Sequence, residues 1–441
     1  MQAYEKNMWY RSVFNEFEKK LNGESSSPVH ALRRDAIAEF DGTGFPTRKH
    51  EEWKYTDVAK LAKTPYVLAV PVHDLKISTE QIAAYSFGSK NRLVFVNGFF
   101  APSLSNVALL PKGLAVGSLS NALNAKDALA KKYCGSLAAP SEGPFVALNT
   151  AFLRDGAFIV VDEGVHVKEV VSLIFLAAGA DTSLIVPRNL VVAGKNSRLS
   201  IVETYVAFGA EAYFTDAVTE IIVGEDAVVE HDKLQDEHAS ASHIASIYVR
   251  QGSHSIVTSN AISVGGSLVR NNVTAVFAGE HAECTLNGLS LATGTQLIDN
   301  HTTIDHAKPN CASHELYKSI LDGKSRGVFN GKIFVRKDAQ KTDAKQTNKT
   351  LLLSDDATVD TKPQLEIFAD DVKCTHGATV GQLDEDQVFY LRARGIGETE
   401  ARDILTLAFA KDVANRIHVD AVREQVERLV FEKLHQGRGK L

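Results

Sequence analysis

Cysteine is scarce in this sequence, which has four cysteines among 441 residues and no Cys-x-x-Cys pair. The first residues mix acidic with apolar side chains, so they lack the uninterrupted apolar stretch of a secretory signal. We therefore expect reduced thiols and a cytoplasmic location. The cysteines stand far apart, as Cys134, Cys284, Cys311 and Cys374.

Long apolar runs and an excess of basic charge are also missing. No apolar run approaches the length of a membrane span, so we expect no membrane-spanning segment. Lys and Arg number 48 against 54 Asp and Glu, and a net charge of -6 gives no electrostatic footprint for nucleic acid. The sequence contains no P-loop, no GxGxxG after a strand, no GxSxG elbow and no HExxH. We therefore expect no nucleotide site in this chain itself.

Short strand-like runs dominate from about residue 151, and helical periodicity is absent there. Gly265, Gly279, Gly294 and Gly323 recur at intervals of 14, 15 and 29 residues. A half-period near 15 and a full period near 30 favour a stacked coil of short strands, that is, a β-helix-like solenoid. A β-sandwich would also use short strands and is the second interpretation. The runs are residues 158–161, 170–176, 190–192, 221–223, 244–249 and 273–277.

Helical patterns flank this region and divide the chain into three parts. We predict a mostly helical N-terminal region over residues 1–150, a β-helix core over 151–384 and a C-terminal helical region over 385–441. Helical ends suit a solenoid, because its last coils otherwise expose apolar surface and unpaired strand edges. Thr399 is the predicted cap of one C-terminal helix. The predicted buried face of that helix is Ile404, Leu405, Ala408, Phe409 and Val413, and that of the next is Val422, Val426, Leu429, Val430 and Leu434.

Cys374 and His376 are the first candidate for a site. They are two residues apart and therefore share a face if the segment is a strand. A thiolate with an imidazole suits iron, zinc or Cu(I). Two ligands cannot close a tetrahedral site, so another segment or a partner chain must supply the rest. The alternative is a buried cysteine beside a capping histidine.

Two further polar clusters have mainly structural interpretations. The run NHTTIDHAKPNCASH has enough ligands for zinc, but their spacing of five, five and three residues fits no common zinc finger. We expect its polar side chains to hydrogen-bond along the solenoid. The run from Glu230 to His238 is rich in acids and histidine, and we expect a solvated loop there. The ligands of the first cluster are His301, His306, Cys311 and His314.

Several long blocks are similar to the SufB/SufD family of iron–sulfur cluster assembly proteins. They are FPTRKHEEWKYTD, DNHTTIDH, SHELYKSILDGKSRGVFNGKI, DAQKTDAKQTNKTLLLSDDATVDTKPQLEIFADDVKCTHGATVG and FYLRARGI. The resemblance spans most of the chain and is densest over residues 299–420. Gly377, Leu391 and the first block resemble the SufD branch more than the SufB branch.

The resemblance implies a mainly β fold, a right-handed parallel β-helix core flanked by N-terminal and C-terminal helices. It implies a non-catalytic scaffold subunit of the SufBCD complex that pairs with SufB through the β-helix and binds the SufC ATPase through helices at about 396–434. Alone, such a chain could form a homodimer. Cys374 and His376 match positions that face SufB, where iron or a transient iron–sulfur cluster would be shared. The rival class is a polysaccharide-active enzyme, because parallel β-helices also carry lyases and hydrolases.

Overall fold

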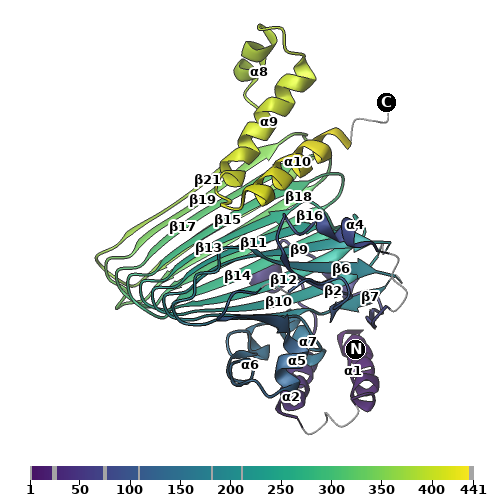
Figure 1. Cartoon of the computed structure of the whole chain (residues 1–441). Coiled ribbons are helices and arrows are strands. Elements are labelled where there is room, and N and C mark those ends of the chain that lie inside the picture. The colour runs from purple at the N-terminus through teal and green to yellow at the C-terminus, as the bar shows by residue number, and fades with distance from the viewer. Residues whose placement is uncertain are drawn as a thin grey trace.

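The computed structural model describes residues 2–21, 27–72, 77–107, 110–179, 182–209 and 212–436. Its centre is a parallel β-solenoid whose successive strands alternate between two facing sheets (Figure 1). The first sheet has the order β20-β18-β16-β14-β12-β10-β8-β5-β4, and the second β21-β19-β17-β15-β13-β11-β9-β6-β2-β3. This confirms the expected mainly β fold with a β-helix core flanked by helices.

The strands lengthen along the solenoid to a nearly constant ten residues. Those of the first sheet are β4 (Leu114–Ser118), β5 (Ala157–Val161), β8 (Arg188–Ala193), β10 (Phe214–Val223), β12 (Ser242–Gln251), β14 (Leu268–Phe277), β16 (Leu297–His306), β18 (Arg326–Val335) and β20 (Thr358–Ile367), with β1 (Val67–Leu68) and β7 (Ser183–Ile185) beside them. Those of the second are β2 (Asn91–Val96), β3 (Phe99–Phe100), β6 (Val171–Ala178), β9 (Arg198–Phe208), β11 (Val228–Asp236), β13 (Ile256–Ser263), β15 (Glu283–Ala292), β17 (Ala312–Leu321), β19 (Asp343–Leu352) and β21 (Lys373–Gly381).

Glycines at one corner of the solenoid allow close contact between successive coils. A Cβ at Gly224, Gly252 or Gly279 would lie 2.8, 2.8 or 2.1 Å from a backbone nitrogen of the preceding coil. A side chain at these positions would force the coils apart. At this corner the chain turns through a residue with positive φ, which follows a glycine in the earlier coils but not in the last two, and Asn, Asp and His tolerate this conformation better than most residues. These residues are Asn196, Asp226, His254, His281, Asn310 and Lys341.

The interior of the solenoid is a column of stacked side chains. The rings of Phe95, Phe175 and Tyr205 stack across three coils, with centroid distances of 5.1 and 4.7 Å. Each parallel pair is in register, so a residue of one strand lies directly beside its equivalent in the next coil. A side chain that points inward therefore contacts its counterparts about 30 residues away in the sequence.

Most of the N-terminal helices cover the outer face of the first sheet (Figure 1), whereas the short helix that contains Ile82 packs on the second sheet. Phe145 and Trp53 pack there, and Phe145 contacts Phe214 of β10 edge to face at 5.9 Å. Strands β2 and β4 precede residue 151 and yet join the two sheets. The helices are α1 (Gln2–Lys19), α2 (Pro28–Thr43), α3 (Ala59–Lys63), α4 (Thr79–Ala83), α5 (Leu119–Asn124), α6 (Ala128–Tyr133) and α7 (Pro144–Ala151), with 3-10 helices η2 (Glu51–Trp53) and η3 (Pro140–Glu142).

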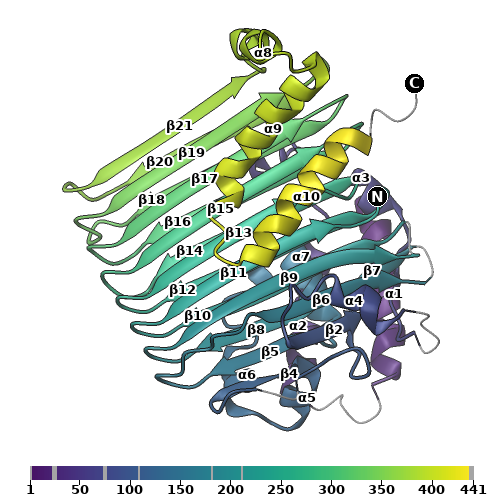
Figure 2. The ribbon, with the colours of Figure 1, turned by 45° about the horizontal axis from the view of Figure 1, so that its top comes forward.

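Three C-terminal helices follow the last strand: α8 (Glu385–Arg392), α9 (Glu398–Ala414) and α10 (Asp420–Gln436). Helices α9 and α10 lie across the outer face of the second sheet, and α8 lies beyond β21 (Figure 2). The predicted buried face of α10 is confirmed. Across the described residues, no helix has both the length and the apolar character needed to cross a membrane.

Two predictions for α9 are wrong. Gly397, not Thr399, is the N-cap. Of the predicted buried residues only Val413 is buried, because the helix turns its smaller side chains toward the sheet and α10, which brings the backbones close together. This rotation leaves Ile404 39% exposed. The buried side chains of α9 are Ala401, Asp403, Thr406, Ala410, Val413 and Ala414.

Candidate functional site

The last coil of the solenoid holds Cys374 and His376. Both lie on β21, which ends the second sheet and pairs with β19 on one side. Cys374 packs against the interior cluster that contains Ile333 and Ala344, so its side chain points into the solenoid. His376, two residues further on, shares that inner face but is exposed at the open end. The structure thus brings the thiol and the imidazole to one edge.

The environment of Cys374 favours the thiol over the thiolate. Burial raises the pKa of Cys374, the charge of Asp343 raises it further, and a backbone hydrogen bond from Ala344 opposes both effects. A cation at this edge would reverse the balance, because a metal ion binds the thiolate. Within the described ranges, no group of three or more His, Cys, Asp or Glu side chains is arranged to hold a metal ion.

The four candidate ligands between residues 301 and 314 do not come together. His306 is buried, shares a hydrogen bond of 2.9 Å with the Ser313 hydroxyl, and has its pKa lowered to about 4 by burial. The Cys311 thiol is buried and donates to the carbonyl of Gly279 at 3.4 Å. His314 lies exposed on β17. The contacts of His306 and Cys311 agree with the structural interpretation, in which polar side chains form hydrogen bonds within the solenoid.

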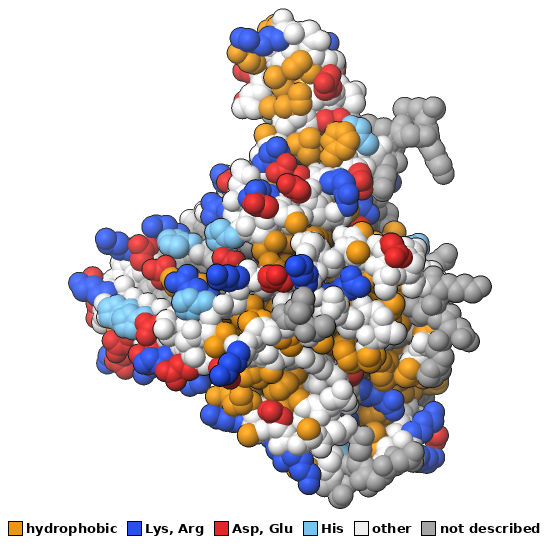
Figure 3. Space-filling model, viewed as in Figure 1, with side chains coloured by type: hydrophobic (Ala, Val, Ile, Leu, Met, Phe, Trp, Pro, Cys, Tyr) orange, Lys and Arg blue, Asp and Glu red, His pale blue; other side chains and the backbone are white. Residues whose placement is uncertain are grey.

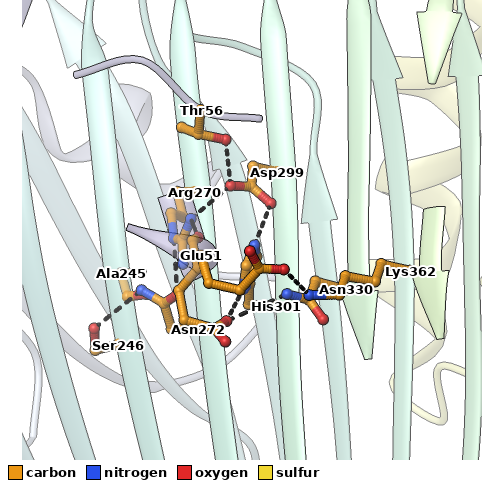
Figure 4. Close-up of polar contacts among 11 residues, drawn as sticks. Glu51, Thr56, Ala245, Ser246, Arg270, Asn272, Asp299, His301, Asn330 and Lys362 are labelled. Atoms are coloured by element: carbon orange, nitrogen blue, oxygen red, sulfur yellow. Dashed lines mark hydrogen bonds and ion pairs between the residues drawn. The ribbon is translucent and has the colours of Figure 1, made fainter. Parts of the chain in front are cut away.

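His301 and Asp299 belong to a group of contacting residues that we call the latch. The latch consists of Glu51, Glu52, Trp53 and Thr56 of the N-terminal segment and Arg270, Asp299, His301, Asn330 and Lys362 of the solenoid. Figure 4 shows polar contacts of the latch. The Arg270 guanidinium lies 3.7 Å from the centre of the Trp53 ring and donates to Asp299 at 2.8 Å. His301 stands between Asp299, at 3.0 Å, and Glu52, at 3.3 Å. The latch joins the N-terminal segment to the outer face of four successive strands, β14, β16, β18 and β20.

The charges of the latch depend on each other. Burial by itself would raise the pKa of Asp299, but the nearby His301 and Arg270 outweigh it and lower the pKa to about 2. A carboxyl with such a pKa stays ionised and is a poor general acid. A cavity of about 270 Å³ beside the latch is lined by His301, Arg270 and Glu142 among others. Arg270 completes the latch, and no recognisable motif surrounds it in the sequence.

The acidic and histidine-rich run from Glu230 is not a solvated loop, and that expectation is wrong. Its first part is strand β11, where His231 and Asp232 are buried. Asp232 accepts a hydrogen bond from Asn260 at 2.7 Å, and Asn260 accepts one from Asn287 at 2.8 Å, so a polar ladder crosses three coils. The ladder is buried because the C-terminal helices cover this face of the sheet. That covering cannot be seen in the local pattern of charges.

Comparison with protein families identifies two matching models that together span most of the chain. Residues 4–173 match the SufBD protein N-terminal region, and residues 175–409 match the SufBD core domain of the SUF system for FeS cluster assembly. The chain belongs to the SufB/SufD family. The boundary between the two matches falls at β6, one coil after the point where the solenoid begins.

Individual relatives agree with this family. The iron–sulfur cluster assembly protein SufD of Escherichia coli strain K12 is 32% identical over 90% of both chains. A SufBD family protein of Synechocystis is 35% identical over 93% of this chain and 92% of its own. SufD of Bacillus subtilis is 24% identical over 96% of this chain and 98% of its own. Within the family the chain is SufD-like.

Proposed function

We propose that this chain is a non-catalytic scaffold subunit for iron–sulfur cluster assembly, which pairs with a SufB-type subunit at the open end of the solenoid. The observation that carries this proposal is the exposure of the last coil together with Cys374 and His376 on its edge. Nearly every residue of β21 is exposed. A strand with unpaired backbone groups is a ready template for a strand of another chain.

Apolar side chains at the same end support a protein partner. Phe368 is 58% exposed, Val380 47% and Ile367 39%, all of them at or beside the last coil. A second copy of this chain is the alternative occupant of the edge. Iron or a nascent cluster is cargo here, which Cys374 and His376 would hold together with ligands of the SufB-type subunit. A partner is required because two ligands leave a tetrahedral iron incomplete.

The C-terminal helices are the proposed contact for a SufC-type ATPase. Phe389 and Tyr390 of α8 are 70% and 57% exposed, and the projecting end of the molecule displays apolar side chains (Figure 3). A cavity of about 740 Å³, lined by Arg402, Thr406 and Lys433 among others, separates part of this helical unit from the sheet. The helices therefore have room to shift when the ATPase changes conformation.

Such a shift would reach the candidate site along a single strand. Gly381 at the end of β21 leads into α8, and Cys374 lies seven residues back along the strand. That separation is about 23 Å at about 3.3 Å per residue. The ATP chemistry would belong to the partner, and this chain would carry no nucleotide site. We propose that the complex works in the cytoplasm.

Reconstitution of the complex with SufB-type and SufC-type partners tests the proposal. In His376→Ala and Cys374→Ser complexes we expect less iron and sulfide bound per complex, with the stoichiometry of subunits unchanged. Thr375→Ala is the matched control, because residue 375 points away from the two ligands. Full cluster formation by both variants, in complexes of normal size, would remove the ligand role.

The enzyme alternative has less support from the outer face of the solenoid. The groove on the first sheet is covered in part by the N-terminal segment, and Asp299 there is held by Arg270 and Thr56 at 2.8 and 2.5 Å. Glycoside hydrolysis needs one carboxyl that can donate a proton. Release of reducing sugar or unsaturated product from acidic polysaccharides by the purified chain would favour this alternative.

A further inference from the structure

His376, Gln346 and Glu315 form one column inside the end of the solenoid. Gln346 of β19 is in register with His376 of β21, and Glu315 of β17 is in register with Gln346. Gln346 and Glu315 are 2% and 3% exposed. Leu286 of β15 comes next below Glu315. The column is therefore apolar at Leu286, and it is polar at Glu315 and Gln346, in the two coils between Leu286 and the open end.

The amide of Gln346 is fixed by its neighbours. Its Nε2 donates to Oε2 of Glu315 at 2.5 Å. On the opposite sheet, a Cβ at Gly331 would lie 2.2 Å from the same Nε2, so only glycine leaves space for the amide. The amide thus fills a pocket shaped for it between the two sheets.

This arrangement leaves one oxygen free to accept a hydrogen bond. Because Nε2 is engaged by Glu315, Oε1 of Gln346 is the acceptor that remains. It is buried and has no hydrogen-bond partner among the described residues. Its neighbour toward the open end is His376, about 4.8 Å away in strand spacing. A buried carbonyl oxygen without a donor is costly, so a donor on the next strand would stabilise the coil.

We infer that Gln346 is a positioning residue for His376: its Oε1 accepts the inward N–H of the imidazole and directs the other ring nitrogen to the open edge. Glu315 acts through Gln346, because it holds the amide in the orientation that presents the oxygen. Histidines that bind metals commonly donate their second N–H to such an acceptor, which fixes the tautomer and the ring orientation. This inference rests on the proposed function of His376 as a ligand.

The tautomer of His376 gives a direct test in the full chain without iron. In protein labelled with 15N-histidine, His376→Ala identifies the imidazole signals of residue 376 by their loss. We expect one neutral tautomer in the wild type and in Glu315→Gln, which keeps an acceptor for the amide. In Gln346→Leu we expect a mixture of both tautomers. Thr350→Val is the control, because it removes a buried hydroxyl from the same inner face of β19 beside Val380 rather than His376.

The same variants are then compared in the reconstituted complex. We expect Gln346→Leu to lower the Fe(II) affinity of the complex roughly 10- to 100-fold, as the loss of a group that orients a metal ligand does, and Thr350→Val to leave it unchanged. An unaltered tautomer of His376 in Gln346→Leu overturns the inference. The inference also fails if Gln346→Leu binds Fe(II) as tightly as the wild type while His376→Ala binds it more weakly. If His376→Ala itself binds iron normally, the proposed function fails, and the tautomer result still decides whether Gln346 orients the ring.

Discussion

Gly288 and Tyr317 lie side by side on β15 and β17, and the ring of Tyr317 occupies the space that a side chain at residue 288 would need. A Cβ on Gly288 would lie 2.2 Å from Cδ1 and 2.3 Å from Cε1 of that ring. Tyr317 is 2% exposed, and its ring lies 5.1 Å from that of Phe329 on the opposite sheet. The glycine is therefore part of the interior packing between the two sheets.

Gly288→Ala should destabilise the solenoid by about 1–3 kcal/mol or more, because the ring is enclosed and an added methyl group overfills the interior. Chemical denaturation followed by circular dichroism measures the change. Gly117→Ala is the matched control, since Gly117 lies on β4, where a Cβ would meet no heavy atom within 4 Å beyond its own chain neighbours. Equal stability of the two variants would show that Tyr317 can move away at little cost.

The repeats of the sequence predicted the solenoid because its coils impose local rules. Several corners carry glycine where coils approach, and each short strand needs apolar residues toward the interior, so the pattern recurs at about the length of a coil. The spacing of Cys374 and His376 likewise predicted a shared face. These features are visible in one stretch of chain at a time.

The remaining contacts could not be predicted, because they join residues that are far apart in the sequence. Arg270 meets Trp53 across 217 positions, and nothing near either residue indicates the other. The register of Glu315 with Gln346 requires the exact length of the intervening coil. Helix α9 turned a different face to the sheet than its apolar residues indicated, since small side chains allowed closer packing.

Arg270→Met should loosen the N-terminal segment and destabilise the protein by about 3–5 kcal/mol. The substitution removes the guanidinium partner of the buried carboxylate of Asp299, and losing one partner of a buried pair is costly. Hydrogen exchange of residues 51–56 should become faster than in the wild type. Arg336→Met is the control: Arg336 pairs with Asp305 at 2.6 Å but is 56% exposed, so about 1 kcal/mol or less is expected. Equal effects of the two substitutions would contradict a latch role for Arg270.

Glu315 should make the stability of the chain depend on pH. Burial raises the pKa of Glu315 to about 7 in the folded protein. Between the ordinary carboxyl pKa and pH 7 the unfolded chain has released this proton while the folded chain still holds it. Stability from this group therefore falls as pH rises, by about 1.4 kcal/mol per pH unit at most and about 3 kcal/mol in total.

Glu315→Gln removes this dependence. As pH rises from 4.5 to 7.5, the wild type should therefore lose stability relative to the variant. Denaturant midpoints of both proteins at several pH values measure the shift. The exposed Glu283 of β15 provides the control variant Glu283→Gln, for which parallel pH curves are expected. Parallel curves for Glu315→Gln as well would mean that Glu315 ionises in the fold as it does in the unfolded chain.

Phe389→Ser on α8 and Phe368→Ser at the last coil should separate the two proposed partners. Both side chains are more than half exposed, at 70% and 58%, so neither substitution should lower the thermal stability of the isolated chain by much. Because exposed aromatic residues commonly dominate an interface, each should weaken one association at least 10-fold. We expect Phe389→Ser to lose the SufC-type ATPase and keep the SufB-type subunit, and Phe368→Ser to do the reverse. Co-purification and titration with each partner measure both affinities.

Loss of the same partner in both variants would mean that the helices and the open end form one continuous surface, and the assignment of one partner to each end would have to be abandoned.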